Sequence, residues 1–398
     1  MDSLAATEAV SRIFSDTSVL QAMLAFEAAL ARAEAQCGVI PARAAAAITE
    51  AARAPETFDC AELARQSLRA GTPAIPLVRV LTEKVRAQDQ EAAVYVHWGA
   101  TSQDVVDTAL VLLLAQCRGV LVAGHQRVQR GLRRLSQDHA NTVMLARTLL
   151  QPAPPITFGL KAAGWLASLR RGWSRVDSRF AESHYLQFGG ASGTLAALGD
   201  RGIQVSEALA DVLGLKHPDA PWHAHRDRLA ALMAALSIYT ASLGKIALDI
   251  ALLMQFEVGE AAEPGGDGRG GSSSMPHKRN PTACMLTVAA AKRTPGLLAN
   301  FLTGMLQEHE RALGGWQSEW TTVQAIVQAA AVAAESMAEV AEGLRVDTGR
   351  MKHNIAATGG LVFAERAVIL MAEERSQAPE DCLGSAEAFR ERLLQGDE

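Results

Sequence analysis

A polar loop carries the residues of this chain that are best suited to chemistry. The stretch Gly270–Pro281 combines glycines, prolines, the serine triplet Ser272–Ser274 and the cationic pair Lys278 and Arg279. Glycine frees the backbone and proline fixes φ, so this composition does not suit a core element. A glycine-rich segment followed by polar residues is typical of a lid that closes over a ligand. The absence of a G-K-[ST] motif disfavours a nucleotide-phosphate loop.

Positive charge is local rather than spread over the chain. Net charge is −5 and no long basic tract occurs, which argues against nucleic acid as a partner. Several cations fall near loop-like segments, where a small polyanionic substrate would need them: Arg147, Arg226, Arg228, Lys278, Arg279 and Arg311. Each could equally be a solvated surface residue.

No metal site is predicted. The five cysteines are widely spaced and form no C-x-x-C pair, and His223 and His225 lie two residues apart in a loop-like segment. This cysteine usage also fits a reducing compartment. With no signal-like amino terminus and only short apolar runs such as 109–115, the sequence predicts a soluble cytoplasmic protein without a membrane segment.

Helices must position these residues. Hydrophobic content is 49% and aromatic content only 5%, which favours helices packed on small side chains. Apolar residues recur at helical spacing in four stretches: 19–35, 104–117, about 228–257, and 321–344. The sequence therefore predicts an all-α fold with an N-terminal helical region (1–95), a central long-helix bundle (96–345) and a short C-terminal helical region (346–398).

Three motifs resemble those of one enzyme superfamily. Gly271–Pro281 matches G-S-S-x-M-P-x-K-x-N-P, His97–Ala109 matches H-x-G-x-T-S-x-D-x-x-D-T-A, and Arg147–Pro155 matches R-T-x-x-Q-x-A-x-P. On these residues the chain is identified as a member of the fumarase/aspartase superfamily. The resemblance covers nearly the whole chain, and the first motif is highly specific.

The resemblance implies an all-α fold whose central bundle forms the core of a homotetramer, with active sites shared between subunits. It implies a small polycarboxylate substrate and no cofactor. Ser272 matches the serine that exchanges a proton with carbon, and Lys278 is the nearest cation able to stabilise its alkoxide. The expected substrate-binding residues are His97, Thr101, Ser102, Arg147, Thr148, Gln151, Asn280 and Arg311.

Two departures from the superfamily narrow the expected reaction. Amine-releasing members carry a histidine, the presumed general acid, where this chain has Leu149, and a second histidine has no counterpart around 71–76. Loss of a general acid costs on the order of 10²–10⁴ in rate. A carboxylate, with a pKa of roughly 4, attacks or leaves at neutral pH unaided. The sequence therefore favours intramolecular addition of a carboxylate to a double bond, as in lactonisation of a carboxy-substituted muconate.

Several alternatives stay open at this level. The substituent could be a sulfonate, particularly because the chain ends soon after the segment 359–365, where relatives usually continue. A succinyl-group lyase that releases fumarate is a second possibility, and a non-catalytic tetramer a third. Trp316 and Trp320, at i and i+4, could line a dry pocket or belong to the core or a subunit interface.

Overall fold

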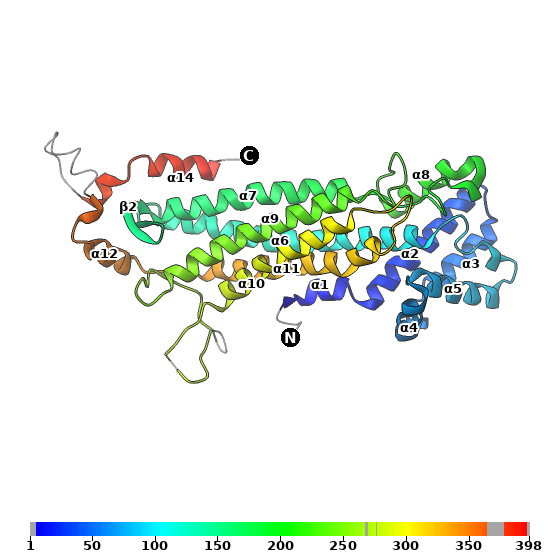
Figure 1. Cartoon of the computed structure of the whole chain (residues 1–398), viewed down its shortest axis with the longest axis horizontal. Coiled ribbons are helices and arrows are strands. Elements are labelled where there is room, and N and C mark those ends of the chain that lie inside the picture. The colour runs from blue at the N-terminus through cyan, green and yellow to red at the C-terminus, as the bar shows by residue number, and fades with distance from the viewer. Residues whose placement is uncertain (1–4, 267–269, 276, 364–377, 396–398) are drawn as a thin grey trace.

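Long helices laid side by side form an elongated body in the computed structural model, which describes residues 5–266, 270–275, 277–363 and 378–395 (Figure 1). Within these ranges the longest helices are α6 (Ser102–Asp138), α7 (Phe158–Ser183), α9 (Asp227–Leu253), α10 (Thr282–Gly304) and α11 (Gly315–Gly343). They include the central stretches predicted from periodicity. The prediction of an all-α, fumarase/aspartase-like fold is confirmed.

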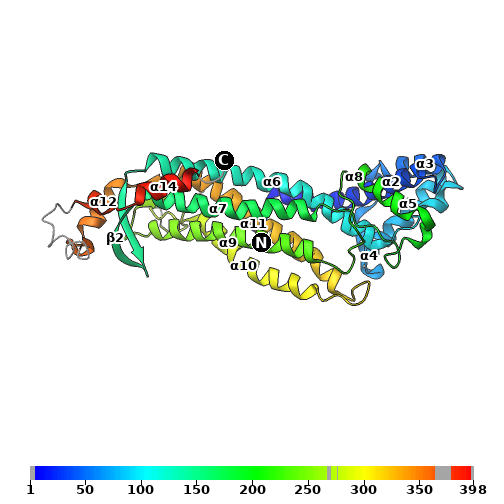
Figure 2. The same cartoon turned by 90° about the horizontal axis from the view of Figure 1, so that it is seen from above.

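Of the amino-terminal helices, all but the first gather at one end of this bundle, whereas the first lies along its side against α6 and α11 (Figures 1 and 2). Ser15 caps the long helix of this region by accepting a hydrogen bond from the Ser18 amide, as its position before the apolar stretch predicts. The helices are α1 (Glu8–Ile13), α2 (Asp16–Gln36), α3 (Ala42–Ala52), α4 (Cys60–Ala70) and α5 (Ala74–Gln88), with 3₁₀ turns η2 (Pro55–Thr57) and η3 (Ala92–Tyr95). Beyond α7, η4 (Ala196–Arg201) and α8 (Gly202–Leu213) return to the same end, where α8 packs on α2.

The carboxy-terminal elements lie at the other end. They comprise β4 (Arg345–Val346), which pairs with β3 (Ala261–Ala262), then α12 (Thr348–Ala356), η5 (Leu361–Phe363), η6 (Pro379–Cys382) and α14 (Ala386–Gln395). The α14 helix turns back along α7 (Figure 1), and the Arg170 side chain donates to the Leu394 carbonyl at 3.4 Å. The division at 95 and 345 stays a prediction, and its second boundary falls inside β4.

Glycine and alanine allow the long helices to approach closely. A Cβ on Gly131 of α6 would lie 2.7 Å from Ala341 of α11, and one on Gly244 of α9 would lie 2.4 Å from the Ala291 side chain of α10. Such separations exclude a larger side chain without backbone movement. Small residues therefore set the helix spacing, as the low aromatic content predicts.

The break predicted at 150–155 is a β-hairpin rather than an open loop. Strands β1 (Val143–Thr148) and β2 (Gln151–Thr157) pair antiparallel, with Thr148 opposite Gln151 and a two-residue turn of Leu149 and Leu150. Both turn residues have positive φ, 51° and 64°. This is the backbone of a type I′-like turn, which normally selects asparagine or glycine. Leucine is strained in this conformation. The hydrophobic periodicity of the sequence therefore does not indicate a turn here.

A charged cluster is buried where α6, α9 and α11 meet. Arg226, fully buried, donates to both carboxylate oxygens of Asp107 at 2.7 and 2.9 Å and to Glu319 at 2.7 Å. The sequence left open whether Arg226 contacts substrate or is a solvated surface residue. It does neither in this structure, because the side chain is buried and its guanidinium nitrogens are held by two protein carboxylates. Trp316 donates to Asp107 at 3.0 Å and lies in the same cluster.

Two helices, α6 and α9, are long and apolar enough to span a bilayer by length and composition alone. Half of the apolar window of α6 and 67% of that of α9 are buried inside the protein. Buried core helices of soluble proteins meet the same criterion. The sequence-based exclusion of any span of sufficient length is thus too strong, although the packing of both helices is that of a core.

We expect Arg226→Met to destabilise the protein by about 3–5 kcal/mol, because it leaves Asp107 and Glu319 buried without a counter-charge. Arg118→Met is the matched control, since Arg118 pairs with Asp177 at 2.6 Å with both side chains about half exposed. Its cost should stay below about 1 kcal/mol. Urea unfolding followed by circular dichroism measures both, and equal losses would contradict a dominant role for the buried cluster.

Candidate active site

The amino terminus of α6 brings together residues from distant parts of the chain. Arg311 donates to the Thr101 hydroxyl at 2.7 Å and to the carbonyls of Gly190 and Ala191 at 3.2 and 3.1 Å. Ser102 begins the helix. The predicted binding residues Thr101, Ser102 and Arg311 therefore form one cationic corner, the α6 corner. It lies at a helix amino terminus, whose dipole favours anions, and Thr101 and Asp104 form a capping box there.

Asp104 holds this corner in shape. The buried carboxylate accepts hydrogen bonds from the amides of Thr101, Gly189 and Gly190 at 2.9–3.0 Å and contacts His223 Nε2 at 2.7 Å. At Gly190, φ is 69° and a Cβ would lie 2.7 Å from the Gly99 carbonyl, so only glycine fits. His223, interpreted from sequence as a loop residue, is buried and supports Asp104.

His97 stands beside this corner in a strained conformation. Its φ is 61°, unusual for a residue with a side chain. Its Nδ1 lies 2.7 Å from the buried Glu27 carboxylate of α2. Burial alone would lower the pKa of His97, but the charge and hydrogen bond of Glu27, together with Asp104, outweigh it, so the pKa is raised.

Two acidic residues of α2 were missed by motif reasoning. Glu27 and Glu34 are seven residues apart, hence on one face of the helix, and both are buried. Burial, and then the charge of Glu27, raises the pKa of Glu34 to about 9. The signal that could have found them is the pair of charges inside the apolar stripe of Leu20, Met23, Leu24 and Leu30.

The loop Gly270–Pro281, called the signature loop from here on, projects from the side of the bundle in its described part (Figure 1). The Ser272 hydroxyl is half-buried and accepts a hydrogen bond from the Met275 amide at 3.2 Å, while Lys278 is exposed. The backbone N–H of Asn280 donates a hydrogen bond to the Gly270 carbonyl at 2.7 Å and so closes the loop. Part of the predicted lid, residues 267–269 and 276, lies outside the described residues.

Glu263 fixes the base of this loop. Its buried carboxylate accepts from the amides of Ala283 and Cys284, at 3.1 and 2.7 Å, in the first turn of α10. A carboxylate is favourable at this positive helix end. Glu263, which precedes the loop, is thereby joined to the first turn of α10, which follows it.

The hairpin presents the third group of predicted residues. Arg147 makes a bidentate ion pair with the buried Glu260 at 2.7 and 2.8 Å, and Asn354 donates to the same carboxylate at 2.7 Å. Thr148 and Gln151 are exposed, and at the turn between them Leu149 is 96% exposed. A hollow of about 670 Å³ beside the hairpin is lined by Arg147, Gln151 and Asn354 among others. A role of Arg147 in substrate binding stays a prediction, and its terminal nitrogens already have a partner.

The α6 corner and the hairpin lie far apart within one chain. Thr101 precedes α6, whereas Arg147 lies in the hairpin that follows it. A helix of 37 residues extends about 55 Å at 1.5 Å per residue. The two ends of the bundle in Figures 1 and 2 therefore carry separate parts of the predicted site.

The two tryptophans of α11 differ in burial, since Trp316 is buried and Trp320 is half-buried. Their rings form an edge-to-face pair with centroids 5.0 Å apart, and Trp316 is buried against Asp107. Of the two interpretations left open by the sequence, the structure of this chain favours core packing for Trp316.

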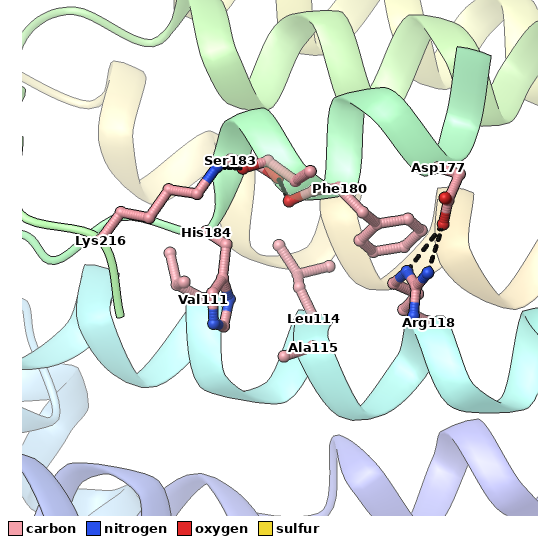
Figure 3. Close-up of a pocket in the computed structure, with 10 residues that line it drawn as sticks. Val111, Leu114, Ala115, Arg118, Asp177, Phe180, Ser183, His184 and Lys216 are labelled. Atoms are coloured by element: carbon pink, nitrogen blue, oxygen red, sulfur yellow. Dashed lines mark hydrogen bonds and ion pairs between the residues drawn. The ribbon is translucent and has the colours of Figure 1, made fainter. Parts of the chain in front are cut away.

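A separate hollow of about 360 Å³ lies between α6 and α7 (Figure 3). Its wall includes Phe180, His184 and Lys216 and the ion pair of Arg118 with Asp177. The Lys216 ammonium is bonded to the Ala181 carbonyl at 2.8 Å. None of the predicted site residues lines this hollow, so it is no part of the candidate active site.

Comparison with known proteins places the chain in a family. The sequence profile of a family described as "Lyase" matches residues 3–296. The chain belongs to this lyase family, and the predicted membership of the fumarase/aspartase superfamily is confirmed.

Individual relatives narrow the resemblance. A 3-carboxy-cis,cis-muconate cycloisomerase of Bradyrhizobium diazoefficiens is 51% identical over 90% of this chain and 79% of its own length. The crystal structure of the 3-carboxy-cis,cis-muconate lactonizing enzyme of Pseudomonas putida has a TM-score of 0.93 and 40% identity, covering 99% of this chain and 97% of that one. A nitrosuccinate lyase of Streptomyces davaonensis is 41% identical over 91% of this chain and 78% of its own length.

We expect Arg147→Lys to destabilise the protein by about 1–3 kcal/mol, because lysine cannot reproduce a bidentate pair with the buried Glu260. The control is Arg127→Lys, whose bidentate pair with Glu342 is partly exposed and worth less than about 1 kcal/mol. Urea unfolding measures both. A negligible effect at Arg147 would show that its pairing with Glu260 does not hold the hairpin.

Proposed function

We propose that this protein is a 3-carboxy-cis,cis-muconate cycloisomerase, which closes a lactone ring by intramolecular addition of a carboxylate. The observation that carries the proposal is the hairpin turn, where Leu149 and Leu150 stand between Arg147 and Gln151. Neither side chain can protonate a leaving group. A reaction whose nucleophile is a carboxylate needs no such proton. The Bradyrhizobium relative, 51% identical, and the Pseudomonas putida enzyme, with a TM-score of 0.93, are both named for this activity.

The chemistry balances with groups of the chain and one proton, which solvent returns to the Ser272 oxygen after each turnover. A substrate carboxylate oxygen forms a bond to an alkene carbon, and the electron pair of the double bond moves to the neighbouring carboxylate as an aci-carboxylate. The Ser272 hydroxyl gives a proton to the adjacent carbon, completing the isomer. Lys278 offsets the charge left on the serine oxygen, and Asn280, Thr101, Ser102 and Arg311 hold carboxylates. No cofactor takes part in this scheme.

We infer that the site is completed in a homotetramer and that this homotetramer is cytoplasmic. One chain separates the α6 corner from the hairpin by the length of α6, so a complete site needs other copies. Apolar side chains about half exposed on the long helices support such an assembly: Ile238 and Leu248 of α9, and Met285 and Leu302 of α10. The small polycarboxylate would then lie between subunits.

With Ser272→Ala, the diene absorbance of 3-carboxymuconate should disappear far more slowly than with the wild type. We expect kcat to fall by about 10²–10⁴, because the proton donor to carbon is removed. Ser274→Ala is the matched control in the same loop and should retain most activity. Ultraviolet spectroscopy follows the reaction directly. Full activity of Ser272→Ala would remove this serine from the mechanism.

The same assay separates the competing functions. Turnover of a sulfo- but not a carboxymuconate would indicate the sulfonate substrate, and release of fumarate from a succinyl adduct would indicate a lyase. Elimination of nitrite from nitrosuccinate, whose leaving group also departs as an anion, would indicate the reaction named for the Streptomyces relative. No turnover of any of these by the folded protein would favour a non-catalytic role.

Mixed tetramers test whether sites are shared. Ser272→Ala and Arg311→Met each disable a different element, so copies of the two variants refolded together should regain activity that neither has alone. Wild-type sites arise only where the intact loop and the intact α6 corner come from different chains. Mixed tetramers purified through two affinity tags provide the measurement, and their complete inactivity would contradict shared sites.

A further inference from the structure

We propose that Glu27 is a positioning residue that holds His97 as an imidazolium cation aimed at a substrate carboxylate beside the α6 amino terminus. The inference rests on the proposed function and adds to it a residue of α2 that lies outside the three motifs. Glu27 touches His97 and not the substrate. Its effect would be transmitted through the charge and orientation of the histidine ring.

In the described ranges, the Glu27 carboxylate has one contact with a titratable partner, His97. The side chain is fully buried, Oε1 lies 2.7 Å from His97 Nδ1, and Oε2 has no hydrogen-bond partner among the described residues. A buried carboxylate without a counter-charge is strongly disfavoured. The single contact therefore favours a proton on Nδ1 and a positive ring.

The backbone conformation of His97 indicates that the orientation of its imidazole ring is enforced by the surrounding structure. A φ of 61° strains a residue that bears a side chain, and such strain persists where the surroundings enforce it. With Nδ1 held by Glu27, Nε2 has no partner within the part of the chain that the structure describes. His97 lies four residues before Thr101, so this nitrogen can donate to an anion gathered at the α6 corner.

The charges that face His97 come from several elements. Glu27 of α2 and Asp104 of α6 both favour its protonation, whereas burial opposes it, and the net effect raises its pKa. Arg311, held on the Thr101 hydroxyl, is the nearest cation identified at the corner. Asp104 is occupied by three backbone amides and His223, so Glu27 is the carboxylate committed to His97.

The pH profile of kcat/KM tests the proposal in the intact protein. Binding through the cation is present at low pH and is lost as pH rises through the raised pKa of His97. Glu27→Gln removes its attraction for the ring and leaves burial opposed only by the charge of Asp104. The alkaline limb assigned to His97 should then move down by about one to three pH units, with KM affected more than kcat. In His97→Asn this limb should vanish.

Glu34→Gln is the matched control on the same helix face. The pKa of Glu34, about 9 through burial and then the charge of Glu27, keeps this side chain neutral near pH 7. The substitution therefore replaces one neutral group by another and should leave the limb in place. Equal shifts in both variants would assign the effect to packing of α2 and overturn the proposal.

A second measurement covers a Glu27→Gln variant that fails to fold. In wild-type protein labelled at histidine, nuclear magnetic resonance should show the His97 ring titrating above its usual range, with the proton on Nδ1 retained. An ordinary or lowered pKa of His97 would overturn the proposal. Wild-type protein without muconate turnover would instead refute the proposed function and leave the titration as the test of the ion pair.

Discussion

The buried carboxylates of α6 are the constraint on which the rest of this structure depends. Asp104 gathers the amides of Thr101, Gly189 and Gly190, and three residues later Asp107 pairs with Arg226, which also holds Glu319. Charges without water must be fully paired, so the loops and helices that supply the partners have little freedom. One turn of α6 thereby connects the buried charges of the helix bundle with the α6 corner at its amino terminus.

The same principle recurs at the other parts of the site. Glu260 fixes the hairpin through Arg147, and Glu263 fixes the start of α10 behind the signature loop. These two acids flank β3, so a four-residue segment connects the hairpin with the loop base. Groups expected to contact substrate are exposed or half-buried, whereas the carboxylates that position them are buried. The α6 corner, the hairpin and the loop base are thus each supported from inside by a buried acid.

Much of the architecture could be predicted because its signals are local. The helical spacing of Leu20, Met23 and Leu24 anticipated α2, and glycine and alanine anticipated close helix packing. The hairpin escaped prediction because leucine at positive φ contradicts local preference and is tolerated only through its surroundings. The burial of Arg226 could not be predicted, because a position near a loop does not reveal it. The contact between Glu27 and His97 joins residues 70 positions apart in the chain and is likewise absent from local patterns.

By itself the sequence determined the family, the helical class and the residue types that can do chemistry, including leucine where a general acid is found elsewhere. These follow from composition, spacing and motifs, which are properties of short stretches. The tertiary structure decided which charges are available. It buried Arg226, occupied Arg147 with Glu260, paired His97 with Glu27, and separated the α6 corner from the hairpin by the length of one helix. Burial and pairing depend on contacts between distant segments, and no local pattern encodes them.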